Sequence, residues 1–206
     1  KNLSDGYATY GDDMPHDDYV RWQQAILAWT WGTLTDAGAI FYNHKPRVGG
    51  DRVRLPLDLI PPQMPIRQII IWDRGSGFNR QHTYYVPAHE WLMLLAKPAF
   101  RTNTRSVDDV WRIPFETGGE HPAPFPLSLA LRAIGTTDAA TVLDPFAGAG
   151  TTALVAVGHG RRAIGCELNP EYADLARNRI DEVDTSVAEP VRVVAPEWGA
   201  LFGKAS

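Results

Sequence analysis

The sequence contains a single cysteine, Cys166, which excludes an internal disulfide and a cysteine-rich metal site. A lone thiol is typical of a reducing compartment, and we expect the protein in the cytoplasm. Long apolar runs are missing too, since none approaches the roughly 18 residues that a membrane-spanning helix needs. The first residues show no basic stretch followed by an apolar one, so neither an export signal nor a membrane partner is expected.

The composition is that of an ordinary globular protein. Of the 206 residues, 44% are hydrophobic and 21% are charged, which is too apolar for a disordered chain. This length fits one domain, or one domain with a small lobe. The net charge of −4 argues against nucleic acid, but residues 45–112 carry eleven basic residues against six acidic ones. A positive face that contacts DNA or RNA therefore stays open as an interpretation.

Helix-like and strand-like patterns alternate along the chain. A helix that starts within residues 14–18 would bury one face formed by Tyr19, Trp22, Ile26 and Trp29. Residues 45–63 and 100–119 have the composition of loops. Strands are expected at 39–42, 69–72, 90–96, 141–144, 162–166 and 191–194, and further helices at 127–134, at 151–157 and from residue 170 onward. This alternation predicts an open α/β sheet with parallel strands and ligands at their carboxyl ends.

The strongest chemical signal is a glycine-rich turn between an apolar strand and a helix, in residues 144–152. Gly148 and Gly150 permit tight backbone geometry and close approach of a ligand. Glu167 ends the next expected strand, 19 residues after Gly148, where a carboxylate can accept hydrogen bonds from both hydroxyls of a ribose. The pattern therefore indicates a site for a nucleoside-containing cofactor.

The spacing leaves the identity of this cofactor open. Ala153 stands where a dinucleotide-binding turn has its third glycine, and alanine is accepted there, so NAD remains an alternative. Asp144 before the turn favours a cofactor with a cationic aminoacyl group, because it would attract an ammonium and repel a pyrophosphate. A purely structural glycine turn without a ligand is the third interpretation.

Five segments resemble motifs of the amino-methylating DNA methyltransferases that use S-adenosylmethionine. Residues 144–152 resemble their cofactor-binding motif, and residues 165–172 resemble the motif that holds the ribose. Residues 120–127 resemble the proline-rich segment that packs over the methionine end of the cofactor. The segments 72–97 and 109–114 resemble the late catalytic half and the stretch before the proline-rich segment. Their order, with the catalytic half first, resembles the permuted β-type subgroup.

The resemblance implies a Rossmann-like α/β fold with a mixed, mostly parallel sheet and helices on both faces. Residues 1–98 would form the catalytic half, 99–119 a short target-recognition region and 120–206 the cofactor half of one domain. It implies S-adenosylmethionine as cofactor and no metal. The expected cofactor contacts are Asp144, Phe146, Gly148, Gly150, Thr151, Glu167, Leu168, His121 and Phe125.

The implied reaction is methylation of N6 of adenine at a specific DNA site, with N4 of cytosine as the alternative. Such enzymes serve restriction–modification in a bacterial cell or a phage-infected host. The substrate would be double-stranded DNA with the target base flipped out of the helix, and a homodimer is compatible with this interpretation. A methyltransferase for RNA and a remnant that binds cofactor or DNA without catalysis are the rival hypotheses.

One element of the family is missing. Its catalytic tetrapeptide, Asp or Ser followed by two prolines and an aromatic residue, does not occur, because Pro61 and Pro62 are followed by Gln63 and lack a preceding acid. The β-type order would place it just before Lys1, on the central strand of the sheet. We therefore expect the 206 residues to belong to a longer protein, with that strand absent from the given chain.

Three stretches are candidates for DNA contact. Arg101 and Arg105 lie in the polar irregular region, where such side chains suit phosphates and base edges. Arg80 and Tyr84 lie in a loop after an expected strand, and an aromatic there could stack on a flipped base. Four basic residues nearer the N-terminus favour phosphate binding: Lys45, Arg47, Arg52 and Arg54. His82 and His89 lack a third metal ligand at suitable spacing.

Overall fold

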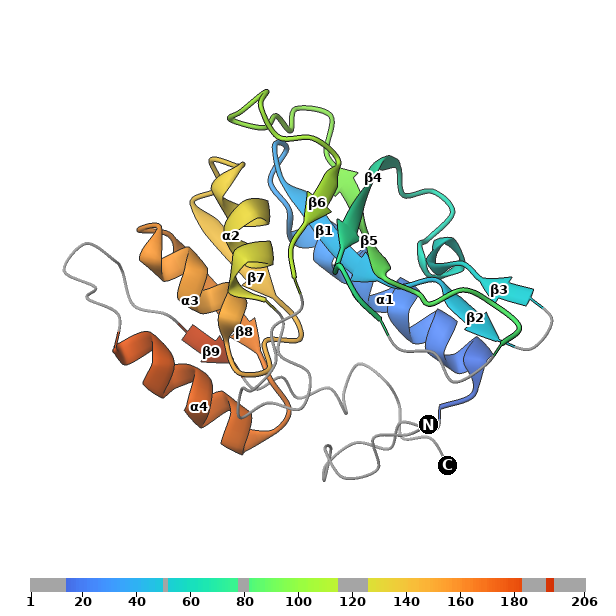
Figure 1. The fold of residues 1–206 in the computed structure, drawn as a ribbon. Helices are drawn as coiled ribbons and strands as arrows, with labels where there is room; N and C mark the ends of the chain where they lie inside the picture. The colour runs from blue at the N-terminus through green and yellow to red at the C-terminus, as the bar shows by residue number, and fades with distance from the viewer. Residues whose placement is uncertain (1–13, 50–51, 78–81, 115–125, 183–191, 195–206) are drawn as a thin grey trace. The chain divides into compact units, whose positions relative to one another are not determined.

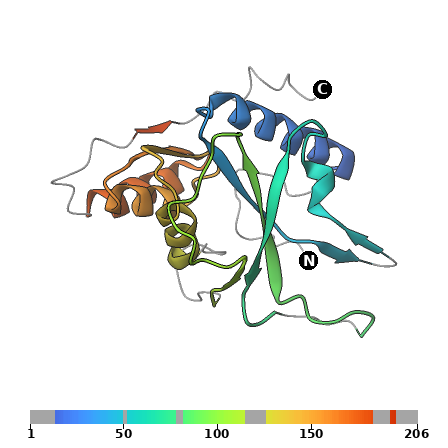
Figure 2. The same ribbon diagram turned by 90° about the horizontal axis from the view of Figure 1, so that it is seen from above.

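The computed structural model describes residues 14–49, 52–77, 82–114, 126–182 and 192–194. These divide into two compact units, one formed by the described residues up to 114 and the other by those from 126 onward. Each unit combines helices with a β-sheet (Figures 1 and 2). The expected α/β class is thereby confirmed for the described residues.

The first unit is built on a four-stranded sheet with the order β1-β5-β4-β6. Its strands are β1 (Ala39–His44), β4 (Ile66–Asp73), β5 (His89–Ala96) and β6 (Val110–Arg112). The helix α1 (His16–Thr33) precedes them, and the hairpin strands β2 (Arg47–Gly49) and β3 (Arg52–Arg54) and the 3-10 helix η1 (Pro56–Leu59) lie between β1 and β4. β5 runs antiparallel to both of its neighbours, and only β6 is parallel to β4.

Strand β5 is central to this sheet, and it is apolar along most of its length because both of its faces are covered. Met93 and Leu95 pack with Leu27 of α1 and with Ile60 and Met64. Leu94 and Ala96, which point to the opposite face, pack with Phe100. All of these side chains are buried, so β5 connects the two apolar layers of the unit.

Helix α1 buries only part of the face that the sequence predicts, since Ile26 is buried and Tyr19 and Trp22 are half-buried. Trp29 is 43% exposed, whereas Gln23 and Thr30 are buried. The two polar side chains are satisfied, because Gln23 Oε1 accepts a hydrogen bond from the Tyr42 hydroxyl at 2.8 Å and Thr30 Oγ1 donates to the Ile26 carbonyl at 2.8 Å. The apolar periodicity missed Gln23 and Thr30 because polar residues carry no apolar signal.

The second unit alternates helices and parallel strands. It contains α2 (Leu127–Gly135), β7 (Thr141–Asp144), α3 (Thr151–Gly158), β8 (Arg162–Cys166), α4 (Pro170–Asp181) and β9 (Arg192–Val194). The strand order is β7-β8-β9, and both pairings are parallel. A single apolar cluster joins α2, α3, β8 and α4. This unit confirms the predicted alternation.

Two predicted loops contain strands, and the predicted parallel sheet is wrong for the first unit. Residues 45–63 fold into the β2–β3 hairpin and η1. Within 100–114, β6 pairs with β4, and Trp111 and Ile113 are 2% and 4% exposed, so these two side chains belong to the core while residues 101–109 are mostly exposed. Each of these strands is three residues long, too short for a clear apolar alternation, and β6 is defined by its pairing with the distant β4.

Candidate cofactor site

The glycine-rich turn lies at the carboxyl end of two paired strands of the second unit. β7 and β8 are parallel, and Asp144 is in register with Gly165. The segments that follow both strands therefore leave the sheet at the same edge, which is where ligands bind in open α/β sheets. The Ala147 N–H donates to the Cys166 carbonyl at 2.9 Å and joins the turn to the end of β8.

Glycine is required at Gly150 for two independent reasons. Its φ of 78° is in the left-handed region that other residues rarely adopt. A Cβ there would also lie 2.7 Å from the Cβ of Ala176 in α4, which is closer than packed atoms come. The turn thus packs against α4 through two very small residues, and this packing fixes the start of α3 relative to the turn.

Glu167 is held by two backbone N–H groups. The Gly148 N–H donates to Oε2 and the Asn169 N–H donates to Oε1, each at 2.8 Å. Each carboxylate oxygen has further lone-pair capacity and can accept from a ligand hydroxyl. The predicted ribose acid and the predicted glycine turn are therefore in direct contact, although 19 residues separate them.

Four more predicted cofactor residues, Asp144, Phe146, Thr151 and Leu168, follow or end the strands at this edge of the unit. Asp144 Oδ1 accepts a hydrogen bond from the Phe146 N–H at 2.9 Å, which leaves its other oxygen for a cation. Phe146 and Leu168, which follow β7 and β8, are 50% and 55% exposed. Large apolar side chains exposed beside a carboxylate suit a ligand with both a flat apolar part and a polar part. Thr151, at the start of α3, is half-buried.

The sequence did not predict two contacts in this site, the one made by the Arg179 guanidinium and the one made by the Asn169 backbone N–H. Arg179 of α4 donates through Nη1 to the Ala149 carbonyl and lies 3.4 Å from Thr151 Oγ1, so it fastens the turn to α4. The Asn169 backbone orients Glu167, while the Asn169 side chain caps α4 by accepting from the Glu171 N–H. The Asn169 cap was readable from the sequence, but Arg179 is 30 residues from its partner and no local pattern indicates it.

Cys166 ends β8 next to Glu167 but is unsuited to nucleophilic chemistry. The side chain is buried, and burial, followed by the negative charge of Asp144, raises the pKa of its thiol. A raised pKa keeps the thiol protonated and unreactive at neutral pH. Cys166 is therefore a poor candidate for a nucleophile.

Four predicted contacts are not part of the described site in the second unit. His121, Phe125 and Arg80 lie outside the described residues. Tyr84 belongs to the first unit, where it lines a pocket of about 290 Å³ together with Val48 of β2 and the exposed Tyr85 and Val86. The structure therefore brings the predicted aromatic loop against the β2–β3 hairpin, a relation that the sequence did not indicate.

Arg101 and Arg105 both lie exposed in the segment before β6. The Arg101 Nη1 donates to the carbonyls of Pro98 and Phe100 at 3.0 and 2.7 Å, so this side chain is held on its own loop. The base of that loop is fastened by Arg67, which donates to the Phe100 and Lys97 carbonyls.

Neither a membrane span nor a metal cluster is found in the described part of the chain. No helix there is long and apolar enough to cross a bilayer. Nor do three His, Cys, Asp or Glu side chains come together there as metal ligands would.

Comparison with known proteins identifies the family. The family model for N6 and N4 methyltransferases, described as DNA methylase, matches residues 2–178, and the chain belongs to this family. The type II methyltransferase M.ScaI of Streptomyces caespitosus is 37% identical over 207 residues, covering 80% of this chain and 68% of that enzyme. M.Cfr9I of Citrobacter freundii is 33% identical over 150 residues, covering 63% of this chain and 48% of that enzyme. The family predicted from the motifs is thereby confirmed.

Solved structures agree with this assignment. A putative DNA modification methylase of Thermus thermophilus, complexed with S-adenosyl-L-methionine, has a TM-score of 0.67 and 26% identity, covering 87% of this chain and 84% of that one. The cytosine-N4-specific PvuII DNA methyltransferase shares the fold, with a TM-score of 0.69 at 18% identity, covering 89% and 77%. The chain spans about half the length of the Citrobacter enzyme and of other curated relatives that it matches.

The packing under the turn generates a stability prediction. Gly150→Ala should lower the free energy of unfolding of the second unit by at least about 1 kcal/mol, because alanine is strained at this φ and its Cβ would meet Ala176. Urea unfolding followed by far-UV circular dichroism measures this. The control is Gly158→Ala at the end of α3, where an added Cβ meets nothing within 4 Å. Equal stability of the two variants would contradict the role assigned to Gly150.

Proposed function

We propose that the protein transfers a methyl group from S-adenosylmethionine to the exocyclic amino group of a base in DNA, as part of bacterial restriction–modification. The observation that carries this proposal is the pair of 2.8 Å hydrogen bonds that hold Glu167 against the glycine turn. Family membership supplies the reaction class. N6 of adenine is the first expected target and N4 of cytosine is the alternative.

The residues of the second unit fit this cofactor. Glu167 would accept hydrogen bonds from the ribose hydroxyls, and Asp144 would attract the ammonium of the methionine part. Phe146 and Leu168 offer exposed apolar surface for the adenine. When bound, S-adenosylmethionine supplies an electrophilic methyl group on a sulfonium. The chain itself contributes binding and orientation, which is the main requirement of a direct transfer. The Thermus thermophilus relative was crystallised with this cofactor.

The group that activates the target amine is not among the motifs of this chain. We infer that it lies on an additional strand, as the motif order suggests. In support, β1 pairs only with β5, and β7 pairs only with β8, among the described strands. Each edge therefore offers N–H and C=O groups to one more strand.

We further propose that DNA is held by the first unit, with the target base flipped out of the duplex. Arg101 and Arg105 would contact the substrate from their loop, and Arg80 and Tyr84 from the loop after β4. Support comes from Tyr84, which lines an open pocket beside exposed apolar side chains, where a flat base could stack. A homodimer is compatible with this arrangement, and light scattering would reveal it.

The reaction itself is the first test. Plasmid DNA incubated with the full-length protein and a methyl-labelled cofactor should gain label, and mass spectrometry of the nucleosides should show N6-methyladenine. N4-methylcytosine would instead select the alternative target. No label in either nucleoside would contradict the proposed function. Transfer by the 206 residues alone would contradict the inferred additional strand.

The cofactor site is tested by Glu167→Gln. The variant should bind S-adenosylmethionine at least about tenfold more weakly in calorimetry, because it loses charged hydrogen bonds worth roughly 1.5–3 kcal/mol. Glu171→Gln, an exposed glutamate in the first turn of α4, is the matched control and should bind as the wild type does. An affinity of the Glu167 variant within about twofold of the wild type would contradict the assignment of Glu167 to the ribose.

The DNA loop is tested at Arg105, which is exposed before β6. Arg105→Ala should weaken DNA binding and reduce the slope of log affinity against log salt by about 0.9, the value for one lost phosphate contact. Arg177→Ala removes the same charge from an exposed ion pair with Asp174 in the second unit and should leave the slope unchanged. If both variants keep the wild-type slope, DNA lies away from this loop.

A further inference from the structure

The β2–β3 hairpin carries its arginines on one face. Arg47 is directly opposite Arg54, and Gly49 is opposite Arg52. Opposite residues of an antiparallel pair point to the same side, as do residues two apart on one strand. The three arginines therefore share a face, and Val48 and Val53, which are 42% and 48% exposed, share the other.

This arrangement is unfavourable for the isolated protein. Like charges directly opposite each other destabilise a strand pair, and the Arg47–Arg54 pair is such a case. Among the described residues, no carboxylate forms an ion pair with either guanidinium. Asp18, in the nearby first turn of α1, pairs with Arg21. Two exposed guanidinium groups of the same strand pair thus have unused hydrogen-bond donors.

The neighbouring side chains hold Arg47 in place. Its guanidinium stacks over the Tyr19 ring, 5.6 Å from the ring centroid. Nδ1 of His44 faces the Lys45 carbonyl at 3.0 Å and must therefore carry the proton, so Nε2 accepts a hydrogen bond from the Tyr19 hydroxyl at 3.1 Å. Burial, with Arg47 and Lys45 nearby, lowers the pKa of His44 and favours this neutral form. The Tyr19–His44 pair therefore fixes the ring on which Arg47 lies.

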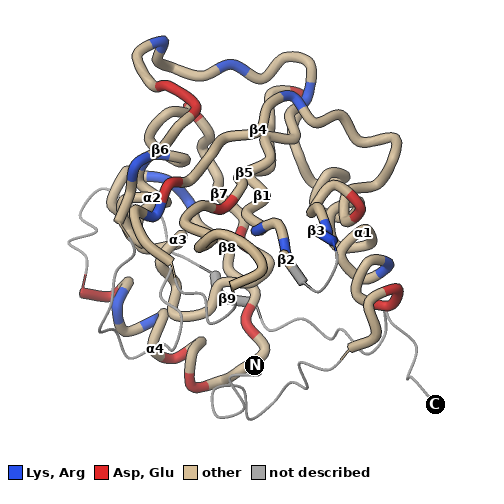
Figure 3. The backbone as a smooth tube through the Cα atoms, turned by 45° about the vertical axis from the view of Figure 1, so that its right-hand side comes forward, with Lys and Arg blue, Asp and Glu red and all other residues tan. Residues whose placement is uncertain are grey.

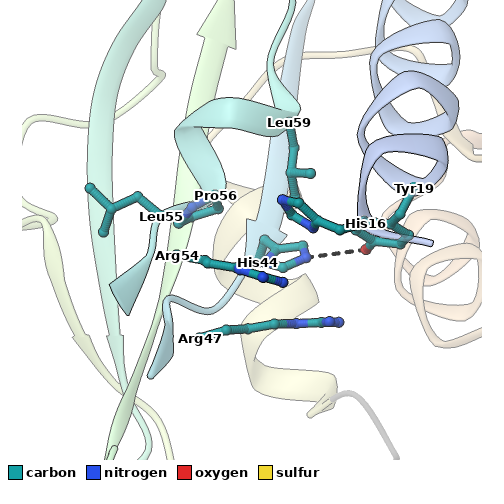
Figure 4. Close-up of a pocket in the computed structure, with 8 residues that line it drawn as sticks. All are labelled: His16, Tyr19, His44, Arg47, Arg54, Leu55, Pro56 and Leu59. Atoms are coloured by element: carbon teal, nitrogen blue, oxygen red, sulfur yellow. Dashed lines mark hydrogen bonds between the residues drawn. The ribbon is translucent and has the colours of Figure 1, made fainter. Parts of the chain in front are cut away.

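Figure 4 shows the guanidinium groups of Arg47 and Arg54 extending to the same side, toward His16 and Tyr19 at the start of α1. These four side chains help to line a pocket of about 20 Å³, which has room for about one water molecule or one ligand oxygen atom. Figure 3 marks the basic residues of this hairpin among those of the first unit. Next to the hairpin, Pro56 and Leu59 of η1 are buried and provide a rigid base.

We propose that the β2–β3 hairpin grips the phosphodiester backbone of DNA through Arg47 and Arg54. This inference rests on the proposed function, since it takes DNA as the substrate. Guanidinium groups bind phosphate through two parallel hydrogen bonds, and successive phosphates of one strand can each take one arginine. Such contacts position the protein on DNA and carry no sequence information. The hairpin is thus a positioning device, separate from the loop of Arg101 and Arg105.

The test uses Arg47→Gln with Arg54→Gln in the full-length protein and a pool of random-sequence duplexes. Loss of two phosphate contacts should lower the slope of log affinity against log salt by about 1.8 and the affinity by roughly tenfold or more. The control, Arg162→Gln with Arg177→Gln, removes two exposed arginines of the second unit and should keep the wild-type slope. Arg47→Lys with Arg54→Lys should restore most of the slope, because lysine also neutralises a phosphate.

Methyl transfer separates this inference from the proposed function. The glutamine pair should raise the KM for plasmid DNA and leave kcat unchanged, since neither arginine takes part in the transfer. A wild-type protein that methylates DNA while the glutamine pair keeps the wild-type slope would overturn the hairpin proposal alone. A lowered slope in a protein that transfers no methyl group would overturn the proposed function alone. A glutamine pair that loses affinity for one sequence only would show base reading and would also overturn the hairpin proposal.

Discussion

The proposed cofactor site depends on one carboxylate that is held by backbone N–H groups from both sides. Glu167 takes one hydrogen bond from the turn after β7 and one from the start of α4. An unheld glutamate at the end of a strand would sample several rotamers and would lose that freedom on binding a ligand. In this protein the two hydrogen bonds already hold the Glu167 side chain in one position, so the free lone pairs of its carboxylate have a fixed direction. Preorganisation of this kind lowers the cost of binding.

Small residues make that arrangement possible. The turn approaches α4 where Gly150 meets Ala176, and it approaches β8 where Ala147 meets Gly165, whose added Cβ would lie 2.9 Å from the Ala147 Cβ. Larger side chains at these positions would push the turn away from both neighbours. The Gly148 N–H would then no longer reach Glu167. The close packing of the turn against α4 and β8 and its hydrogen bond to Glu167 are thus two consequences of the same local sequence.

The sequence predicts this unit well because its signals are local. A glycine turn between a short strand and a helix, followed by a strand with an acid directly after it, is defined within about 25 residues, and the order of elements follows from it. The first unit was harder to predict for the opposite reason. β6 has three residues and exists through its pairing with β4, about 40 residues earlier. The β2–β3 hairpin is polar and short, and α1 buries Gln23 and Thr30 because distant or backbone partners satisfy them.

Charge is distributed unevenly between the two units. The net charge of −4 conceals a basic stretch at residues 45–112, all within the first unit, and an acidic remainder. The proposed cofactor is a cation at its sulfonium and its ammonium, and the proposed substrate is a polyanion. A single surface could not attract both, since charges that favour one repel the other. Asp144 and Glu167 lie at the glycine turn, and Arg47, Arg54, Arg101 and Arg105 lie in the other unit, so the proposed sites would offer each ligand charges of the sign it needs. An acidic isoelectric point is therefore no argument against DNA binding when the basic residues are gathered in one unit.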